Sequence, residues 1–294
     1  MKRSTTILVV VLVVLAGMTF LVLQRQGETS GTGKTGELLV NFDSAAVDKL
    51  TVQTRQGAVE LQKEAGIWML TSPVRYPADE SLVAQALGKG RQIALKGIVS
   101  SNPQKQQLFE VDSSGTLVRV FEKGAERAAF RVGKPGPSFT ETYVRKEGTQ
   151  DVYLAEGMFG YYFARQAKEW RDRTIFKTDQ AAVRSVTLQF GDTTVALSLR
   201  DSVWRVDTAK AADAAVRTFL GSVTNLQADG FIDDQPSALP PLVCTISLAG
   251  VDLRFFVVNN SDKYYVLSSA SPRLFEIPGW RATQLLKRKK DFLQ

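Results

Sequence analysis

The chain has 294 residues, 44% of them apolar, which predicts a substantial core and about two domains of roughly 100 to 200 residues each. It contains no histidine, which excludes zinc enzymology and catalysis by Ser-His or Cys-His pairs. The formal net charge of +7 is spread along the chain, whereas nucleic-acid binding requires a concentrated basic patch. We therefore expect no nucleic-acid partner.

The apolar run at residues 7–23 contains 17 residues without a charge and follows Lys2 and Arg3. With Thr5 and Thr6 it makes a helix about 28 Å long, close to the ~30 Å thickness of the hydrocarbon layer. The alternative is a cleaved signal peptide, but the run exceeds the ~7 to 15 residues usual there and no A-x-A-like site follows. Met18 stands where a lipoprotein would carry its lipidated cysteine, so lipidation is excluded. We predict a transmembrane helix at 7–23.

The charges beside this run predict its orientation. Lys2 and Arg3 place the short tail, residues 1–6, in the cytoplasm by the positive-inside rule. The body would then lie on the extracytoplasmic side of a bacterial inner membrane. Residues 24–36 are rich in Gly, Ser, Thr and Gln and predict a flexible linker. The linker sequence at 31–35, GTGKT, lacks the first glycine of a phosphate-binding loop because Glu28 stands there, so no nucleotide is expected.

The rest of the chain repeats itself. A shift of 136 residues aligns 45–70 with 181–206, and eight positions are identical, including Trp68 with Trp204. Beyond this stretch a shift of 133 aligns Val83, Leu87, Gly97 and Pro103 with Val216, Leu220, Gly230 and Pro236. The period is that of a domain, so we predict two tandem copies of one module.

Each copy begins with short alternating segments that predict antiparallel strands. An amphipathic helix follows, and we expect Gly97 and Gly230 to mark the helix exits. Further strands come next, and a final helix at 159–170 or 281–292 closes each copy. The expected strands are 50–53, 59–61, around Trp68, 117–121, 129–132, 142–145 and 152–154, then 186–189, 195–199, around Trp204, 243–248, 253–258, 264–267 and 274–277. The expected apolar stripes are Val83, Ala86, Leu87, Gly90 and Ile93, then Val216, Phe219, Leu220, Val223 and Leu226.

The predicted fold class is therefore α+β, with a transmembrane helix ahead of two modules that each combine an antiparallel sheet with helices. We place the first module at residues 37–177 and the second at 178–294. The two copies should superpose, with Trp68 and Trp204 at equivalent buried positions.

A set of spaced motifs gives the chain a family resemblance. A strand ending in tryptophan precedes the segment 73–79, a loose Pro-x-x-x-x-Ala-Asp, and Val132-Gly133, Tyr143-Val144 and Trp170-Arg171-Asp172 follow. This pattern resembles the bacterial family of domain of unknown function 4340. The resemblance covers nearly everything after the linker and implies an accessory role beside an ABC transporter permease and an auxiliary subunit. In the second copy we align Lys290-Asp291 with the Trp-Arg-Asp triplet.

Several residue groups are candidate sites, and each also has a structural interpretation. Trp170 to Arg173 would fix a domain joint, and the aromatic residues of 158–163 would pack the closing helix, with a peptide groove as the alternative. Of the adjacent carboxylates, Asp79-Glu80 suits a helix start, and Asp233-Asp234 shows no converging partner for acid-base chemistry. Cys244, the single cysteine, lies in an apolar run and is expected to be buried. The basic cluster 287–290 is interpreted as a solvated terminus, with partner or lipid binding as the alternative.

These observations predict no catalytic, cofactor-binding or metal-binding residue, and no enzyme activity. The leading hypothesis is a membrane-anchored, extracytoplasmic accessory or scaffold protein of an ABC-type envelope transport system. The alternative is a periplasmic lipid- or glycan-binding carrier that uses a cleft between sheet and helix.

Overall fold

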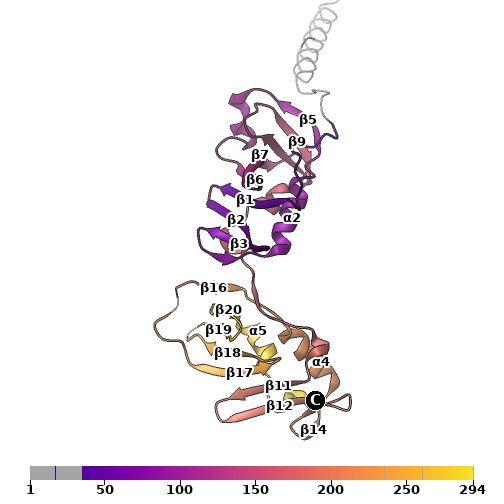
Figure 1. Cartoon of the computed structure of the whole chain (residues 1–294), viewed down its shortest axis with the longest axis vertical. Helices are drawn as coiled ribbons and strands as arrows, with labels where there is room; N and C mark the ends of the chain where they lie inside the picture. The colour runs from indigo at the N-terminus through magenta and orange to yellow at the C-terminus, as the bar shows by residue number, and fades with distance from the viewer. Residues whose placement is uncertain (1–16, 18–34, 235, 260, 294) are drawn as a thin grey trace, which may run out of the picture. The chain divides into compact units, whose positions relative to one another are not determined.

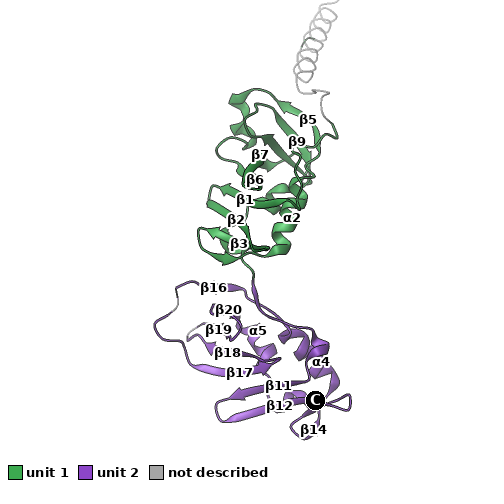
Figure 2. Cartoon of the chain, viewed as in Figure 1, with its two compact units in different colours: residues 1–172 green, residues 173–294 purple. Residues whose placement is uncertain are grey.

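The computed structural model describes residue 17 and residues 35–234, 236–259 and 261–293 (Figure 1). The predicted membrane segment lies outside these residues, except for Gly17. The predicted linker also lies outside them, except for residues 35 and 36. Within them, no helix has the length and apolar character required to span a bilayer. The chain divides into two compact units, one ending at Asp172 and one beginning at Arg173 (Figure 2).

Over residues 35–172, the first unit contains one large antiparallel sheet and two short helices. The described strands are ordered β4-β3-β2-β1-β6-β7-β8-β9-β5. The strands are β1 (Val47–Thr54), β2 (Gly57–Glu64), β3 (Ile67–Ser72), β4 (Tyr76–Pro77), β5 (Leu95–Ser100), β6 (Thr116–Glu122), β7 (Ala125–Pro135), β8 (Glu141–Lys146) and β9 (Val152–Glu156). The helices are α2 (Glu80–Gly90) and α3 (Phe159–Phe163), with 3-10 turns η1 (Pro103–Lys105), η2 (Gln107–Phe109) and η3 (Ala167–Trp170).

The second unit has a large sheet with the corresponding order, β14-β13-β12-β11-β17-β18-β19-β20-β16. Its strands are β11 (Ser185–Phe190), β12 (Thr193–Arg200), β13 (Val203–Val206), β14 (Ala209–Lys210), β16 (Gly230–Ile232), β17 (Leu242–Leu248), β18 (Val251–Val257), β19 (Lys263–Ser268) and β20 (Leu274–Pro278). The helices are α4 (Asp213–Val223) and α5 (Gly279–Leu285), with turns η4 (Gln180–Ala182) and η5 (Lys289–Phe292). Each strand of one sheet thus has a counterpart at the same place in the other, and the antiparallel α+β class is confirmed.

The unit division falls five residues before the boundary predicted at Lys177. The strand β10 (Thr174–Lys177) pairs with β15 (Asn225–Gln227), a short strand after α4, and forms a separate two-stranded sheet in the second unit. Main-chain pairing therefore gives residues 174–177 to the second unit.

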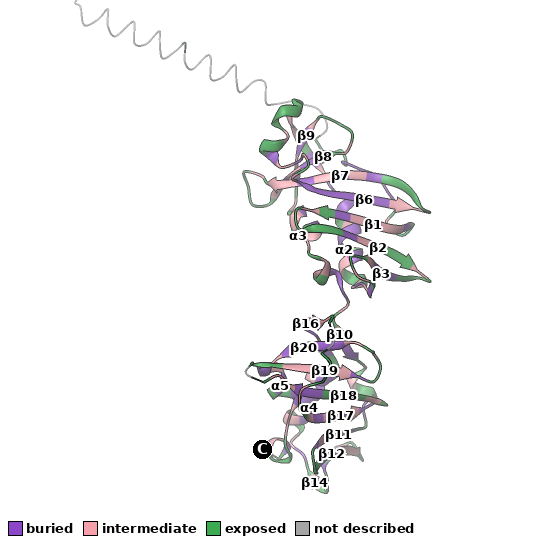
Figure 3. Cartoon of the chain, turned by 90° about the vertical axis from the view of Figure 1, so that its left-hand side faces the viewer, coloured by how far each residue is buried: buried purple, intermediate pink, exposed green. Residues whose placement is uncertain are grey.

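Alternation in the strands separates a core face from a polar face in each sheet. In β1, Leu50 and Val52 are fully buried, whereas Thr51 and Gln53 point away from the core. The helices cover the apolar face, and Figure 3 shows buried and exposed segments alternating along the strands. The buried positions of α2 are Val83, Ala86, Leu87 and Gly90, and those of α4 are Val216, Phe219, Leu220 and Val223. Four residues of each predicted helical stripe are confirmed, but the fifth is wrong: α2 ends at Gly90, before Ile93, and Leu226 lies in β15, after the end of α4.

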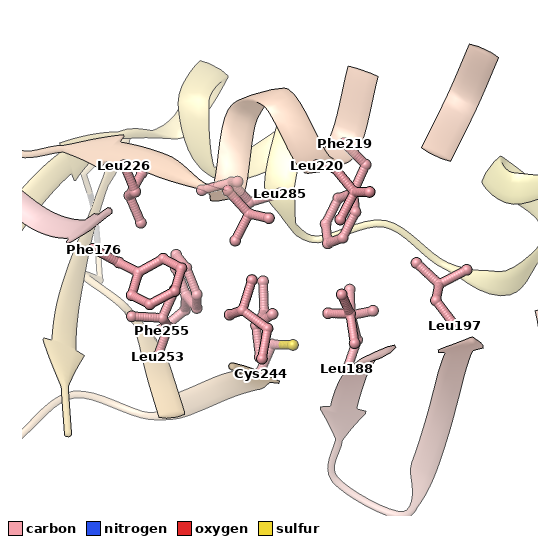
Figure 4. Packing of buried hydrophobic residues seen from close by; sticks show 14 of the residues in the cluster. Phe176, Leu188, Leu197, Phe219, Leu220, Leu226, Cys244, Leu253, Phe255 and Leu285 are labelled. Atoms are coloured by element: carbon pink, nitrogen blue, oxygen red, sulfur yellow. The ribbon is translucent and has the colours of Figure 1, made fainter. Parts of the chain in front are cut away.

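The core of the second unit forms between α4, α5 and the strands β11, β12, β17 and β18. Figure 4 shows Phe219 and Leu220 of α4 directed toward Leu188 and Leu197 of the sheet. Cys244 lies in the same core, fully buried in β17, and burial raises the pKa of its thiol to about 12. The predicted role of Cys244 as a buried apolar residue is confirmed.

Two predictions about helix ends are wrong. The closing helices expected at 159–170 and 281–292 are each broken into a short α-helix and a 3-10 turn, α3 with η3 and α5 with η5. In η3 the Gln166 backbone N–H donates to the Glu169 carboxylate at 2.7 Å, a capping contact that starts a new turn. Gly97 and Gly230 lie in strands β5 and β16 and do not end helices, since they pair with Leu154 and Glu276.

Backbone hydrogen bonds also correct the predicted alignment of Trp170-Arg171-Asp172 with Lys290-Asp291. Trp170 ends η3 and its carbonyl accepts the Asp79 N–H at 2.8 Å, and Phe292 ends η5 and accepts the Ala212 N–H at 2.8 Å. The counterpart of Trp170 is therefore Phe292, and Lys290-Asp291 is not the matching pair. The two strand tryptophans take equivalent places in β3 and β13, but Trp68 is buried and Trp204 only partly buried.

Candidate functional site

The family-like motifs of the first unit meet in space. Trp170 is fully buried, Arg171 pairs as an isolated bridge with Ala78, and the Asp172 N–H donates to the Pro77 carbonyl at 2.9 Å. The Arg171 guanidinium carbon lies 5.1 Å from the centre of the Tyr76 ring. The triplet thus fastens the closing segment to the start of α2. This geometry supports a structural role for residues 170–172, but these contacts join segments of the first unit and not two domains.

The carboxylate beside this joint caps α2. Asp79 accepts hydrogen bonds from the backbone N–H groups of Ser81 and Leu82 at 2.9 and 3.1 Å. The predicted helix-start role of Asp79 is confirmed. Asp233 and Asp234 are both exposed after β16.

The aromatic segment 158–163 divides between the core and the surface. Phe159 and Phe163 are buried, and the Phe163 ring meets that of Phe130 edge-on at 5.5 Å. Met158 and Tyr161 are exposed. Core packing therefore explains Phe159 and Phe163, but it does not explain the exposed Met158 and Tyr161.

A cleft lies between the β1–β2 turn and the stretch that joins α3 to η3. Two hollows of about 340 and 330 Å³ share Thr54 and Gln56 and adjoin there. The first is lined by Thr54, Gln56, Gly57, Ala58, Val59, Pro73, Arg165, Gln166 and Ala167. The second is lined by Thr54, Arg55, Gln56, Glu110, Ser114, Gly115, Thr116, Val132, Gly133, Lys134, Pro135, Gly160 and Ala164. We call this pair of hollows the sheet–helix cleft.

Arg165 is the charged group of the first hollow. Its guanidinium carbon lies 4.9 Å from the centre of the Tyr161 ring and 5.9 Å from that of Trp170. These aromatic contacts hold a cationic side chain in place through cation–π attraction. Within the described part of the chain Arg165 has no carboxylate within ion-pair distance, so its charge is available to a ligand.

The second hollow carries more positive than negative charge. Arg55 pairs with Glu110 at 3.3 Å and donates from Nε to the Ser114 carbonyl at 2.9 Å. Lys134 lies on the same wall, with its Nζ 6.0 Å from the centre of the Tyr143 ring. Over both hollows the cleft is therefore lined by three cationic residues, Arg55, Lys134 and Arg165, and one carboxylate, Glu110, a balance that attracts anions.

A partly buried ion network supports the wall that carries Glu110. Arg131 bonds through Nε to Glu147 at 2.8 Å and through Nη1 to the Asp112 carbonyl at 2.8 Å. Arg145 donates to the Val111 carbonyl at 2.8 Å, and burial lowers the pKa of this guanidinium. Burial opposes ionisation of Glu147, but the hydrogen bonds and charge of Arg131 outweigh it and hold the pKa of this carboxyl below its ordinary value.

Glycine permits the close packing of this wall. A Cβ atom at Gly133 would lie 2.2 Å from the Phe109 carbonyl oxygen, which no side chain could accommodate without backbone movement. Tyr143 packs on Phe109 with ring centroids 4.8 Å apart. The resemblance motifs Val132-Gly133 and Tyr143-Val144 thus shape the base of the loop that borders the cleft.

The second unit closes the equivalent place. Phe190 ends β11 where Thr54 ends β1, and Arg288 begins η5 where Gln166 begins η3. The Arg288 guanidinium carbon lies 3.6 Å from the centre of the Phe190 ring, so the two segments are in contact. Lys289 of the same basic cluster pairs with Asp207 at 2.7 Å. Thr54 and Gln166 therefore leave the cleft open in the first unit, whereas Phe190 and Arg288 fill the equivalent place in the second unit.

Sequence reasoning missed Thr54, Gln56, Arg165 and the ion network. Only the shift alignment of Thr54 with Phe190 offered a signal, because it places a small polar residue opposite a large aromatic one. Among the residues that the structure describes, no group of three or more His, Cys, Asp or Glu is placed to hold a metal ion. The expectations of no cofactor, no metal and no enzyme activity stay predictions.

Comparison with known proteins identifies the family. Residues 68–243 match the family described as Domain of unknown function (DUF4340), and the match covers more than half of the chain. The chain belongs to this family, as its motifs indicated. The matched residues include all four motif segments, 73–79, 132–133, 143–144 and 170–172. No curated protein and no solved structure matches the chain.

Proposed function

We propose that this DUF4340 protein is a single-pass, membrane-anchored accessory or scaffold subunit of an ABC-type envelope transport system at the bacterial inner membrane. The observation that carries the proposal is the pair of sheets with the same strand order, each with a polar face that its helices leave uncovered. Two such faces provide broad surfaces for protein partners. The apolar run 7–23 supports the anchor, and the family resemblance supports the transport context.

The topology is tested separately. A reporter fused after Gly33 should report the extracytoplasmic side, because Lys2 and Arg3 keep the N-terminus inside. Strong activity of a cytoplasm-only reporter at the same position would overturn the localisation of the body.

The subunit role is tested by releasing the body from the membrane. Tethering raises the effective concentration of the body at a membrane partner, so a modest interface suffices there and fails in free solution. A form with residues 1–26 replaced by a cleavable export signal should fold but fail to complement a deletion strain at equal periplasmic abundance. The anchored form should crosslink to membrane proteins. Full rescue by the released form without a crosslinked partner would refute the subunit role.

A second candidate is a carrier module for a lipid or glycan, and the sheet–helix cleft favours it. The cleft combines hydroxyl, amide and guanidinium groups from Thr54, Gln56 and Arg165. Substitution Thr54→Phe with Gln166→Arg would reproduce the Phe190–Arg288 contact and fill the cleft. The filled form should lose binding of an acidic hexasaccharide or a short-chain anionic lipid in calorimetry. Arg119→Ala on the open sheet face is the control and should bind normally, and equal binding by the filled form would exclude the cleft.

A further inference from the structure

The rim of the sheet–helix cleft carries exposed apolar side chains. The second hollow is bordered by Pro135 and Gly160, and each belongs to a segment with large exposed residues. Phe139, in the β7–β8 loop, is 89% exposed, Met158 is 58% exposed and Tyr161 is 66% exposed. The Gly157 N–H donates to the Thr140 carbonyl at 2.7 Å, which holds the two segments side by side. We call Phe139, Met158 and Tyr161 the apolar rim.

Apolar and cationic groups are therefore adjacent at one place. Tyr161 belongs to the rim and also stacks on Arg165, which lines the cleft. Lys134 lies in the same wall as Pro135, five residues before Phe139 of the β7–β8 loop. A membrane interface offers matching chemistry, because acidic headgroups lie directly above an apolar layer.

The short segment between the apolar run and the first unit keeps the cleft and its apolar rim close to the bilayer. The Gly36 N–H donates to the Leu95 carbonyl and the Leu95 N–H to the Glu37 carbonyl, both at 2.8 Å. The chain therefore enters the first unit beside the start of β5. Only residues 24–34 separate it from the apolar run in the sequence, and a stretch of this length reaches at most roughly 40 Å. The start of β5 also lies near the rim, since the Glu156 N–H donates to the Ala94 carbonyl at 3.4 Å, next to Gly157.

We propose that the sheet–helix cleft of the first unit binds the phosphate headgroup of an anionic membrane lipid, with the apolar rim inserted into the bilayer interface. Arg165 contacts the phosphate, with Lys134 as a second cation, and Glu110 remains engaged by Arg55. The inference rests on the proposed membrane anchor. The second unit does not share the site, because Arg288 and Phe190 occupy the equivalent place.

The insertion of the rim is measured with the full chain in nanodiscs. Phe139→Cys carries an environment-sensitive fluorophore, and Cys244 stays unlabelled because its thiol is buried and its pKa is raised to about 12. Lipids brominated along the acyl chain should quench this probe, which is expected about 5–10 Å below the headgroup boundary. Lys123→Cys, in the polar β6–β7 turn at the other end of β7, is the matched control and should stay unquenched. Equal quenching at both positions, or none at Phe139→Cys, would overturn the proposal.

Tethering and insertion are separated by a second reporter. A probe at Ser138→Cys should be quenched in the native sequence and lose most of its quenching when Phe139→Ser and Met158→Ser are added. Unchanged quenching would show that the tether alone holds the loop at the membrane, which contradicts the proposal. If the native chain fails to float with liposomes, the anchor itself is wrong, whereas a floating chain without quenching refutes only the lipid site.

The headgroup contact has its own comparison. Quenching at Phe139→Cys should be stronger in phosphatidylglycerol than in phosphatidylcholine nanodiscs, and Arg165→Ala should abolish this preference while Arg165→Lys keeps part of it. Arg119→Ala, which removes a cation from the open sheet face, should leave the preference intact. Full competition by millimolar glycerol phosphate in solution would identify a site for free phosphates and overturn the assignment to a lipid. An equal response in both lipids would also overturn it.

Discussion

The substitution Phe292→Ala should destabilise the second unit strongly, although only two residues follow it in the sequence. The ring is 1% exposed and meets Phe219 edge-on with centroids 5.3 Å apart. Chain ends usually tolerate substitution, but the tolerance depends on burial rather than on position. Here the ring belongs to the core beneath α4, and the Phe292 carbonyl accepts the Ala212 N–H at the start of that helix.

The expected loss follows from this burial. Replacing a fully buried phenylalanine by alanine costs about 3–5 kcal/mol, which includes about 0.5–1.5 kcal/mol from the aromatic pair. A unit of this size is stable by about 5–15 kcal/mol, so the substitution removes at least about a fifth of that stability. With a urea slope of about 1–3 kcal/mol per molar, the unfolding midpoint should fall by at least about 1 M.

Hydrogen exchange followed by mass spectrometry in increasing urea resolves the effect by segment. Peptides from β17 and β18 report the second unit, and peptides from β6 and β7 report the first, which should be unchanged. Leu293→Ala is the control, because that side chain is 46% exposed and should change the free energy of unfolding by no more than about 0.5 kcal/mol. A loss below about 1 kcal/mol for Phe292→Ala would refute the role assigned to the closing turn.

Helix capping should differ between the units. Asp79→Ala removes the N-cap of α2 and should lower the stability of the first unit by about 1 kcal/mol in thermal unfolding. Ala212→Asp should stabilise α4, because that helix lacks a side-chain cap. An unchanged or lower melting temperature for Ala212→Asp would contradict this. Glu147→Gln should destabilise the first unit by about 1–3 kcal/mol at pH 7, because it leaves Arg131 and Arg145 without their carboxylate. The folded pKa of Glu147 is lowered, so its stabilisation is present above the ordinary pKa of about 4.3 and lost as pH falls through the lower folded value. Urea midpoints of both proteins should therefore converge as pH falls below the ordinary pKa of this carboxyl, and a constant gap would argue against the ionic origin. The Cys244 thiol should react with a thiol reagent at the rate of unfolding, and rapid labelling of the native protein would contradict its burial.

Much of the fold follows from local sequence. Alternation in β1 and β11 places Leu50, Val52, Val186 and Leu188 inward, and the first four residues of each predicted stripe lie on the buried faces of α2 and α4. These features depend on the two periods of the backbone, which the sequence displays directly. The repeat was visible for the same reason, since equivalent cores conserve the positions of apolar side chains.

The breaks in the closing segments could not be read from periodicity. Residues 159–170 contain enough apolar positions for a continuous helix, but the capping contact of Gln166 with Glu169 turns the chain and buries Trp170. Such a break depends on whether tertiary burial of one large ring outweighs continued helical hydrogen bonding. For the same reason the equivalence of Trp170 and Phe292 emerged only from their shared hydrogen-bonding position.

The sequence by itself determined the α+β class, the duplicated module, the buried thiol of Cys244 and membership of the family, because periodicity and motif spacing are properties of neighbouring residues. Only the tertiary structure decided where the cleft lies and that it opens in one copy. The residues that form it, Thr54, Lys134 and Arg165, come from three distant segments, and their proximity depends on strand register and on the turn after α3. The contact of Arg288 with Phe190 likewise joins positions almost a hundred residues apart in the sequence. A site assembled by long-range packing leaves no local pattern, and this is why the chemistry of the cleft was absent from the sequence-based prediction.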